Sequence, residues 1–177
     1  MASMSADIIK KALILMGHGS RVPGAGSSME QVAEQLIEAG RFDVVETCYM
    51  SRLGPAFPDV LKKCIDQGAI EVMLIPYFLN MGLHIRVDIP NMLRREAEKY
   101  PGLKIIFGKN LGYDELLVEL VKKRIDESSE LLDVREIEIE EESYELPPGE
   151  KEFVSMTPEE AKEYRKKHKH GGEPHEH

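Results

Sequence analysis

Four short apolar runs alternate with longer segments in which apolar residues recur at helical spacing. The runs cover residues 10–16, 42–50, 70–78 and 103–107. Within the first run, residues 12–16 are apolar at every position and lead directly into Gly17, which is typical of a strand buried on both faces. We therefore expect four strands, each followed by a loop.

The segments that follow these runs are predicted to be helices. They cover residues 27–39, 58–67, 88–100 and 113–126, and the last carries apolar Leu116, Leu117, Leu120, Val121 and Ile125. Ser27 or Ser28 is expected to cap the first helix, and Gly40 and Gly68 to end the first two. Pro90 should lie in the first turn of the third helix. Fourfold alternation of strand and helix predicts an α/β fold, a parallel sheet with helices on both faces.

The negative charge of the chain is concentrated in its last 49 residues. From Ser129 onward there are 15 acidic and 7 basic residues, which accounts for −8 of the net charge of −9. Residues 1–128 are nearly neutral and have no basic stripe, which argues against a nucleic-acid partner. We therefore divide the chain into an α/β domain, residues 1–128, and an acidic extension, residues 129–177.

The extension carries three weaker patterns. Residues 135–140 alternate charged and apolar side chains, which predicts an edge strand. Thr157 and Pro158 are typical of the start of a short helix. Residues 168–177 are polar and hold four of the six histidines, which predicts a disordered end. This His-rich end either gathers metal ions or is a solvated tail, and the sequence leaves both interpretations open.

Two features bear on where the chain works. No apolar run approaches the roughly 20 residues that a membrane span needs, and the start lacks the small-residue cleavage site of a signal peptide. Cys48 and Cys64 are the only cysteines, far apart and without metal-binding spacing. We interpret both as small buried side chains in a protein of the reducing cytoplasm.

Two histidines follow strands of the predicted sheet. His18 comes directly after the first strand and His84 follows the third, and these are the only histidines outside the extension. Sites in open parallel sheets lie beyond the carboxyl ends of the strands. A single loop histidine is more often a solvated residue, but a pair at one edge indicates a site. Neutral imidazole accepts protons and binds borderline-soft metal ions.

The same loops carry glycines and arginines. Gly17 and Gly19 flank His18, which lets the backbone approach a flat ligand or simply makes a tight turn. Arginine side chains pair with carboxylates, and a surface role in solubility is the alternative for each one alone. The cationic residues of these loops are Arg21, Arg52, Arg86 and Lys109.

These motifs together resemble a known family. Residues 17–21, Gly-His-Gly-Ser-Arg, are similar to the opening of the class II chelatases, in particular the short sirohydrochlorin chelatases of the CbiX type. Residues 75–79 with Gly82, His84 and residues 88–90 resemble that family's second signature, and residues 111–114 its last segment. The similarity covers roughly residues 9–127. It implies a flavodoxin-like, chelatase-like fold that inserts a divalent metal ion into sirohydrochlorin, a tetrapyrrole.

The resemblance also assigns roles to residues. It implies that His18 and His84 are both the catalytic residues and the metal ligands. The residues expected to bind the substrate are Ser20, Arg21, Ser51, Arg52 and Arg86. The apolar stretch 77–83 is expected either to face the flat ring or to pack in the core. The metal is a substrate, with cobalt favoured and nickel or iron as alternatives, and no tightly bound cofactor is expected.

The chain departs from the family at one position. Many members have an acidic residue about four places before the proline that opens the second helix, and here that position is Ser51. Either the acid is dispensable or Glu46 replaces it, although Glu46 lies lower on the strand. The family architecture has two α/β halves facing each other across the tetrapyrrole cleft, and this chain supplies one. The resemblance therefore implies a homodimer.

Two other classes of function compete with a chelatase. One is a non-catalytic protein that stores or delivers cobalt or nickel through the His-rich end, and such a protein does not need paired histidines at a sheet edge. The other is a phosphate-binding domain, because the glycine-rich loop opens a helix. That loop lacks the spacing of a P-loop or a dinucleotide fingerprint, which disfavours the phosphate-binding alternative.

Overall fold

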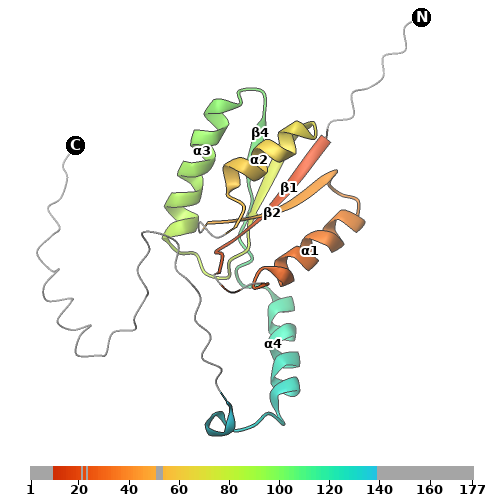
Figure 1. The fold of residues 1–177 in the computed structure, drawn as a ribbon, viewed down its shortest axis with the longest axis vertical. Helices are drawn as coiled ribbons and strands as arrows, with labels where there is room; N and C mark the ends of the chain where they lie inside the picture. The colour runs from red at the N-terminus through yellow and green to blue at the C-terminus, as the bar shows by residue number, and fades with distance from the viewer. Residues whose placement is uncertain (1–9, 21, 23, 51–53, 139–177) are drawn as a thin grey trace, which may run out of the picture. The chain divides into compact units, whose positions relative to one another are not determined.

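A computed structural model of the chain describes residues 10–20, 22, 24–50 and 54–138. Four strands form one sheet: β1 (Lys10–Gly17), β2 (Val44–Tyr49), β3 (Ala69–Pro76) and β4 (Lys104–Phe107). Their order is β2-β1-β3-β4 and every neighbouring pair is parallel (Figure 1). The strands form where the apolar runs were expected, because consecutive apolar residues suit strands that are covered on both faces.

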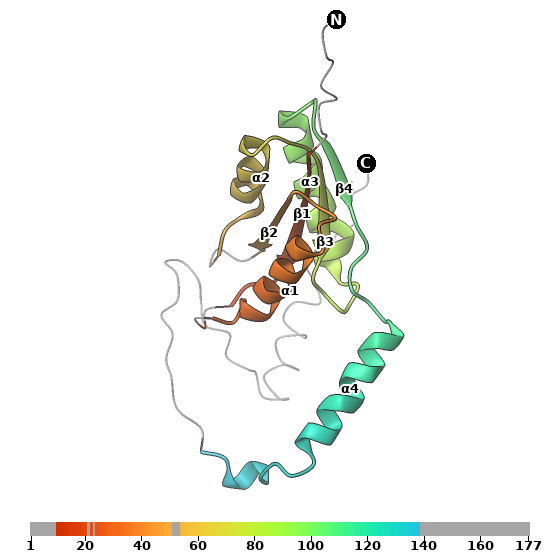
Figure 2. The same cartoon turned by 90° about the vertical axis from the view of Figure 1, so that its right-hand side faces the viewer.

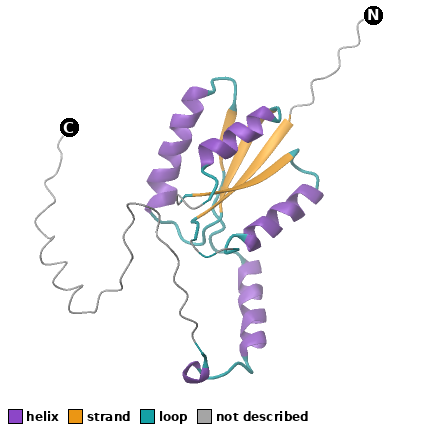
Figure 3. Cartoon of the chain, viewed as in Figure 1, coloured by secondary structure: helices purple, strands orange, loops and turns teal. Residues whose placement is uncertain are grey.

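Helices lie on both faces of this sheet, as predicted. They are α1 (Ser27–Glu38), α2 (Phe57–Asp66) and α3 (Ile89–Lys99). The fourth helix, α4 (Glu115–Ser128), forms where it was predicted but does not cover the sheet, because none of its residues is buried. A π-helical turn, His84–Asp88, leads into α3, and a 3-10 turn, Val134–Glu136, follows α4 (Figure 3). Helix α1 packs on one face of the sheet, and α2 and α3 pack on the other (Figure 2).

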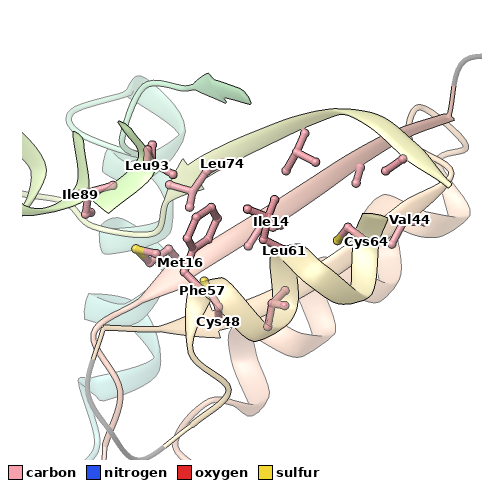
Figure 4. Packing of buried hydrophobic residues seen from close by; sticks show 14 of the residues in the cluster. Ile14, Met16, Val44, Cys48, Phe57, Leu61, Cys64, Leu74, Ile89 and Leu93 are labelled. Atoms are coloured by element: carbon pink, nitrogen blue, oxygen red, sulfur yellow. The ribbon is translucent and has the colours of Figure 1, made fainter. Parts of the chain in front are cut away.

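The core is divided into two clusters by β1, whose residues from Ala12 to Gly17 are all buried. Alternate side chains of a strand point to opposite faces, so Leu13 and Leu15 pack against α1 while Ile14 and Met16 pack against α2 and α3. Phe57 of α2 is at the centre of the larger cluster (Figure 4). The two cysteines belong to the same cluster and are fully buried, which confirms their interpretation as core side chains.

The helix ends were predicted correctly at the glycines and wrongly at the serines. Gly40 and Gly68 have φ values of 68° and 92°, the left-handed conformation that ends a helix. Ser27 and Ser28 do not cap α1, because both lie inside its first turn. The N-cap is Gly26, which is already close to helical conformation (φ −85°, ψ −10°) and makes no side-chain capping bond.

The predicted edge strand is not formed over the described part of residues 135–140. Residues 134–136 make the 3-10 turn instead, and residues 137 and 138 follow it without strand pairing. Asp133 stabilises this turn by accepting hydrogen bonds from the backbone and guanidinium of Arg135. Residues 139–140, the short helix expected at Thr157 and the His-rich end at residues 168–177 lie outside the described residues. Among the helices that are described, none has the length and apolarity to cross a membrane.

Candidate active site

His18 and His84 meet at the carboxyl edge of the sheet. Strands β1 and β3 are neighbours, and their ends are joined by a 2.7 Å hydrogen bond from the Tyr77 backbone to the Met16 carbonyl. The loops that leave these strands therefore run side by side. The ring centroids of His18 and His84 are 5.9 Å apart, with an angle of 64° between the planes. The structure thus brings together the two histidines that the sequence placed in separate loops.

This separation allows both rings to bind one ion. An ion held by two imidazoles lies about 2.0–2.1 Å from each nitrogen, hence about 3.2 Å from each ring centre, so the ring centres are at most about 6.4 Å apart. The observed 5.9 Å falls inside this limit. Both side chains are exposed, so an ion can reach them from solvent. Two protein ligands leave several coordination positions open, which suits an ion that has to be passed on.

Asp88 orients the His84 ring. The π-helical turn places His84 and Asp88 four residues apart on one side, and His84 Nδ1 lies 2.7 Å from Asp88 Oδ2. An ionised carboxylate can only accept, so Nδ1 is the donor and Nε2 of the neutral ring keeps its lone pair. Ile85 and Ile89 are buried and anchor the turn in the core. His18 has a weaker partner, because its Nδ1 lies 3.4 Å from the Gly19 carbonyl oxygen.

Asp88→Ala is expected to weaken the binding of a divalent ion such as Co²⁺ by the histidine pair about 10- to 100-fold, because the ring of His84 loses the carboxylate that fixes its tautomer. Asp88→Asn should recover part of the affinity, since the amide oxygen still accepts the Nδ1 proton. Titrations with the ion beside Glu98→Ala, an exposed acidic residue of α3, provide the comparison. Equal affinities for Asp88→Ala and Glu98→Ala would show that Asp88 has no positioning role.

Two adjoining cavities lie beside His18. The smaller, about 190 Å³, includes His18 in its wall, and the larger, about 370 Å³, opens next to it. Both are lined by Ser20 and Tyr49, but His84 lines neither. Ser20 also accepts a hydrogen bond of 3.1 Å from the Val22 backbone, which fixes its hydroxyl at this edge. One chain therefore offers the two histidines on an open surface beside small cavities.

Tyr49 is a site residue that the sequence did not single out. A Cβ on Gly26 or Gly54 would overlap its ring, so both loops close around the tyrosine. Its pKa is raised, first by burial of the hydroxyl and then by the charge of nearby Glu30. No local signal identifies the packing of Gly26 against this ring, since Gly26 lies 23 residues before Tyr49 in the sequence. The partnership of His84 with Asp88 did have a signal, the four-residue spacing of the two side chains.

Arg86 is the only predicted substrate-binding arginine within the described residues. It lies two places after His84 in the π-helical turn and is exposed, as is Lys109 after β4. Arg21, Ser51 and Arg52 lie outside the described residues. The stretch 77–83 was expected either to pack in the core or to face a flat ring. Tyr77 and Phe78 pack against the core clusters. The exposed members are Leu79, Met81 and Leu83.

No third metal-binding side chain joins the two histidines in the part of the chain that the structure describes. Glu46 is in the middle of β2 and forms an ion pair with Lys63 of α2 at 2.7 Å, away from the carboxyl edge. Burial raises the pKa of the Cys48 thiol to about 12 and that of Cys64 to about 11. Both thiols therefore remain protonated, and a thiol binds metal only as the thiolate.

The fold and this pair of histidines define an open parallel α/β protein with an exposed two-imidazole site at its carboxyl edge. Residues 12–128 match the model of the CbiX family. The matched segment covers well over half of the chain and includes every described element that builds the site. The chain therefore belongs to the CbiX family.

Relatives of two lengths match this chain. The sirohydrochlorin cobaltochelatase of Methanopyrus kandleri is 31% identical over 137 residues, which cover 66% of this chain and 96% of that protein. The sirohydrochlorin ferrochelatase of Priestia megaterium is 27% identical over 118 residues, 67% of this chain but 44% of the relative. The crystal structure of the sirohydrochlorin chelatase SirB from Bacillus subtilis subspecies spizizenii in complex with cobalt superposes with a TM-score of 0.63, at 30% identity, over 67% of this chain and 51% of that one. The chain thus spans nearly all of the first relative and about half of the other two.

Proposed function

We propose that this chain is a sirohydrochlorin chelatase, an enzyme that inserts a divalent metal ion into the tetrapyrrole. The observation that carries the proposal is the exposed pair His18 and His84, 5.9 Å apart, in a chain of the CbiX family. The names of its relatives, cobaltochelatase and ferrochelatase, support the same substrate. The enzyme needs no tightly bound cofactor in this proposal, because the metal ion is itself a substrate.

The two imidazoles share the same two tasks in the reaction, holding the ion and accepting protons. Insertion removes water from the ion, bends the macrocycle and releases two pyrrole N–H protons. Nε2 of His84 faces the ion or a pyrrole proton with its lone pair, because Nδ1 is held by Asp88 at 2.7 Å. His18 supplies the second imidazole. As the four pyrrole nitrogens take over the ion, each ring can accept one of the two departing protons and pass it to water.

Charged and apolar groups around the histidines suit the substrate. Sirohydrochlorin carries several carboxylates on the rim of a flat ring. Arg86 and Lys109 are exposed cations at this edge and suit the carboxylates. The exposed side chains of Leu79, Met81 and Leu83 suit the face of the ring. By sequence position, Ser20, Arg21, Ser51 and Arg52 complete the substrate-binding set.

Cobalt is the metal that we favour, with iron and nickel as alternatives. Relatives named as cobaltochelatases and as ferrochelatases both match the chain. All three ions accept nitrogen ligands, and the order of their affinities does not decide which is used in the cell. Initial rates with each metal on the same tetrapyrrole would identify the preferred ion.

The working unit in this proposal is a cytoplasmic homodimer with a shared cleft. A macrocycle has two faces, and the exposed edge of one sheet covers only one of them. A two-fold axis would bring His18 and His84 of both copies around one cavity. The same arrangement would supply four imidazoles in a chain whose Ser51 replaces the acid of other family members.

The visible spectrum of the tetrapyrrole tests the function directly. Full-length protein, Co²⁺ and sirohydrochlorin are mixed, and the conversion of the free macrocycle to its metal complex is followed against a reaction without protein. Turnover of many macrocycles per chain supports a chelatase. Binding of cobalt without acceleration of insertion would instead favour the storage or delivery protein.

The acidic extension is proposed to assist at low metal concentration rather than to catalyse. Deletion of residues 155–177 should leave insertion at saturating metal unchanged, because the segment has few apolar residues to contribute to a core. If the four terminal histidines gather ions, the rate of the shortened chain should fall only when the metal is scarce. Replacement of those histidines by glutamine in the full-length chain is the matched control, because it removes the imidazoles and keeps the rest of the segment. Equal rates at every metal concentration would indicate a solvated tail.

A further inference from the structure

The Tyr49 side chain lies beside the backbone from which His18 departs. Tyr49 is the last residue of β2, and the parallel register pairs it with Gly17, the residue before His18. The Met50 backbone donates to the Gly17 carbonyl at 3.0 Å, which ties the ends of the two strands together. The Tyr49 ring points to the side of α1 and packs, partly buried, against the cluster that contains Met29. The ring therefore lies against the start of the His18 loop.

Three glycines leave room for this ring. A Cβ on Gly17 would lie 3.3 Å from Tyr49 Cδ1. A Cβ on Gly54 would overlap the ring, and one on Gly26 would overlap the phenolic oxygen. None of the three glycines has a positive φ, so they are needed for space rather than for backbone conformation. They come from the end of β1, the start of α1 and the loop before α2, and the ring is the common contact of these three segments.

His18 depends on this support more than His84 does. The His84 ring is held by Asp88 at 2.7 Å, which fixes it through a side chain of the same anchored turn. The contact of His18 Nδ1 is 3.4 Å long and goes to the carbonyl oxygen of neighbouring Gly19. That distance is longer than an ordinary hydrogen bond, and Gly19 belongs to the same loop, so the contact does not tie His18 to the rest of the fold. The position of His18 is therefore set mainly by its backbone, against which the Tyr49 ring lies.

We propose that Tyr49 is a positioning residue of the active site, whose ring holds the His18 loop at the distance from His84 that a shared ion requires. The inference rests on the proposed chelatase function and names a residue that acts on the metal ion through His18. The ring centroids of the two histidines are 5.9 Å apart, close to the limit of about 6.4 Å for two imidazoles on one ion. A displacement of His18 by about 1 Å away from His84 would exceed this limit and leave the ion with one imidazole.

The hydroxyl of Tyr49 has surroundings of its own. The point beside Gly26 where a Cβ would overlap the phenolic oxygen is 3.5 Å from Glu30 Oε1, so the hydroxyl lies next to the carboxylate of α1. Burial and the charge of Glu30 raise the pKa of Tyr49, so the hydroxyl stays protonated and does not become a metal-binding phenolate. The contact with Gly17 is made by a ring carbon. The positioning role therefore belongs to the ring, and Tyr49→Phe separates it from the hydroxyl.

Initial rates of cobalt insertion test the role of the ring. Tyr49→Ala should lower kcat about 100-fold, the cost of a misplacement of about 1 Å, while KM for sirohydrochlorin changes little. Tyr49→Phe should recover most of the rate, because it keeps the ring. Tyr100→Ala is the matched control, since Tyr100 is also a partly buried tyrosine but lies just before β4, at the opposite end of the sheet. Equal kcat values for folded Tyr49→Ala and Tyr100→Ala chains, a loss in Tyr49→Phe as large as in Tyr49→Ala, or a rise in KM alone would each overturn the proposal.

Crowding of the ring gives a second test, which does not depend on whether Tyr49→Ala folds. Gly26→Ala should lower kcat, because its Cβ would overlap the phenolic oxygen. Tyr49→Phe in the same chain should restore part of the rate, since the nearest remaining ring atom, Cζ, is 2.9 Å from that Cβ and a small shift relieves the contact. The loss in Gly54→Ala should not be restored by Tyr49→Phe, because its Cβ would overlap the ring itself. Equal responses of the two glycine variants to Tyr49→Phe would contradict a role for the position of the ring.

The imidazole signals in nuclear magnetic resonance spectra give a readout that needs neither metal nor tetrapyrrole. When the four terminal histidines of the full-length chain are replaced by glutamine, His18 and His84 are the only histidines, and His18→Ala assigns their signals. Tyr49→Ala should shift or broaden the His18 signal and leave that of His84, whereas Tyr49→Phe and Tyr100→Ala should leave both. An unchanged His18 signal in Tyr49→Ala would overturn the positioning role whether or not the chain inserts metal. A changed His18 signal in a chain without insertion activity would refute the chelatase proposal and leave the positioning of His18 standing.

Discussion

His84→Ala is expected to lower the rate of metal insertion at least about 100-fold while the fold persists, because the loss of a positioned acid or base typically costs a factor of this size or more. The side chain of His84 is 53% exposed, so its removal leaves no cavity in the core. The turn itself remains anchored by buried Ile85 and Ile89. Initial rates from the visible spectrum of the macrocycle, with circular dichroism of each variant, measure the effect.

His18→Ala should reduce the rate similarly, and the double variant should lose little more than either single one if the two rings act on the same ion. Lys62→Ala, on the exposed side of α2, is the control for a surface substitution. Insertion at the wild-type rate by a folded His84→Ala chain would remove His84 from the mechanism. A rate lost only at low metal would instead assign the ring to ion capture.

The second large effect is on stability. Phe57→Ala should lower the free energy of unfolding by about 3–5 kcal/mol, the usual cost of truncating a buried phenylalanine. Phe57 is 1% exposed and is among the largest fully buried side chains, so the deleted ring leaves a cavity between α2 and the sheet (Figure 4). Since domains are stable by only about 5–15 kcal/mol, this change removes a large part of the total.

Urea unfolding at fixed protein concentration measures this difference, because a dimer makes the midpoint depend on concentration. Leu131→Ala is the control, since Leu131 is 73% exposed and its truncation should change the free energy of unfolding by less than about 0.5 kcal/mol. Equal unfolding midpoints for the two variants would mean that the core rearranges to fill the space of the ring.

The strands, the helices and the meeting of the two histidines could be predicted from local pattern and one topological rule. Consecutive apolar residues such as 12–16 identify buried strands. Parallel strands all end at the same edge, so residues that follow β1 and β3 are expected to be close, and His18 and His84 are. The rule predicts that the two histidines are close but does not predict how their rings are oriented. The orientation of the His84 ring depends on the π-helical turn and on Asp88.

The wrong predictions concern the cap of α1 and the strand expected at residues 135–140, and both were decided by local backbone conformation. Capping by Ser27 or Ser28 was a reasonable prediction from residue type, but Gly26 entered the helical conformation one residue earlier. The alternation in residues 135–140 suggested a strand, whereas the local bond from Asp133 to Arg135 favoured a turn. The helix predicted at residues 113–126 forms as α4, but it does not cover a face of the sheet as expected, because none of its residues is buried. Periodicity predicts the helix and does not show where it packs.

The burial of the two thiols determines which ligands the chain offers to borderline-soft metal ions. Cobalt, iron and nickel bind thiolate sulfur well, and a reachable thiolate would compete with the macrocycle for every incoming ion. Cys48 and Cys64 are fully buried, protonated and the only cysteines in the sequence. An ion that arrives at the carboxyl edge therefore encounters imidazole nitrogens, which exchange ligands readily, and no thiolate that would retain it. The same burial also shields the thiols from oxidation catalysed by these redox-active metals.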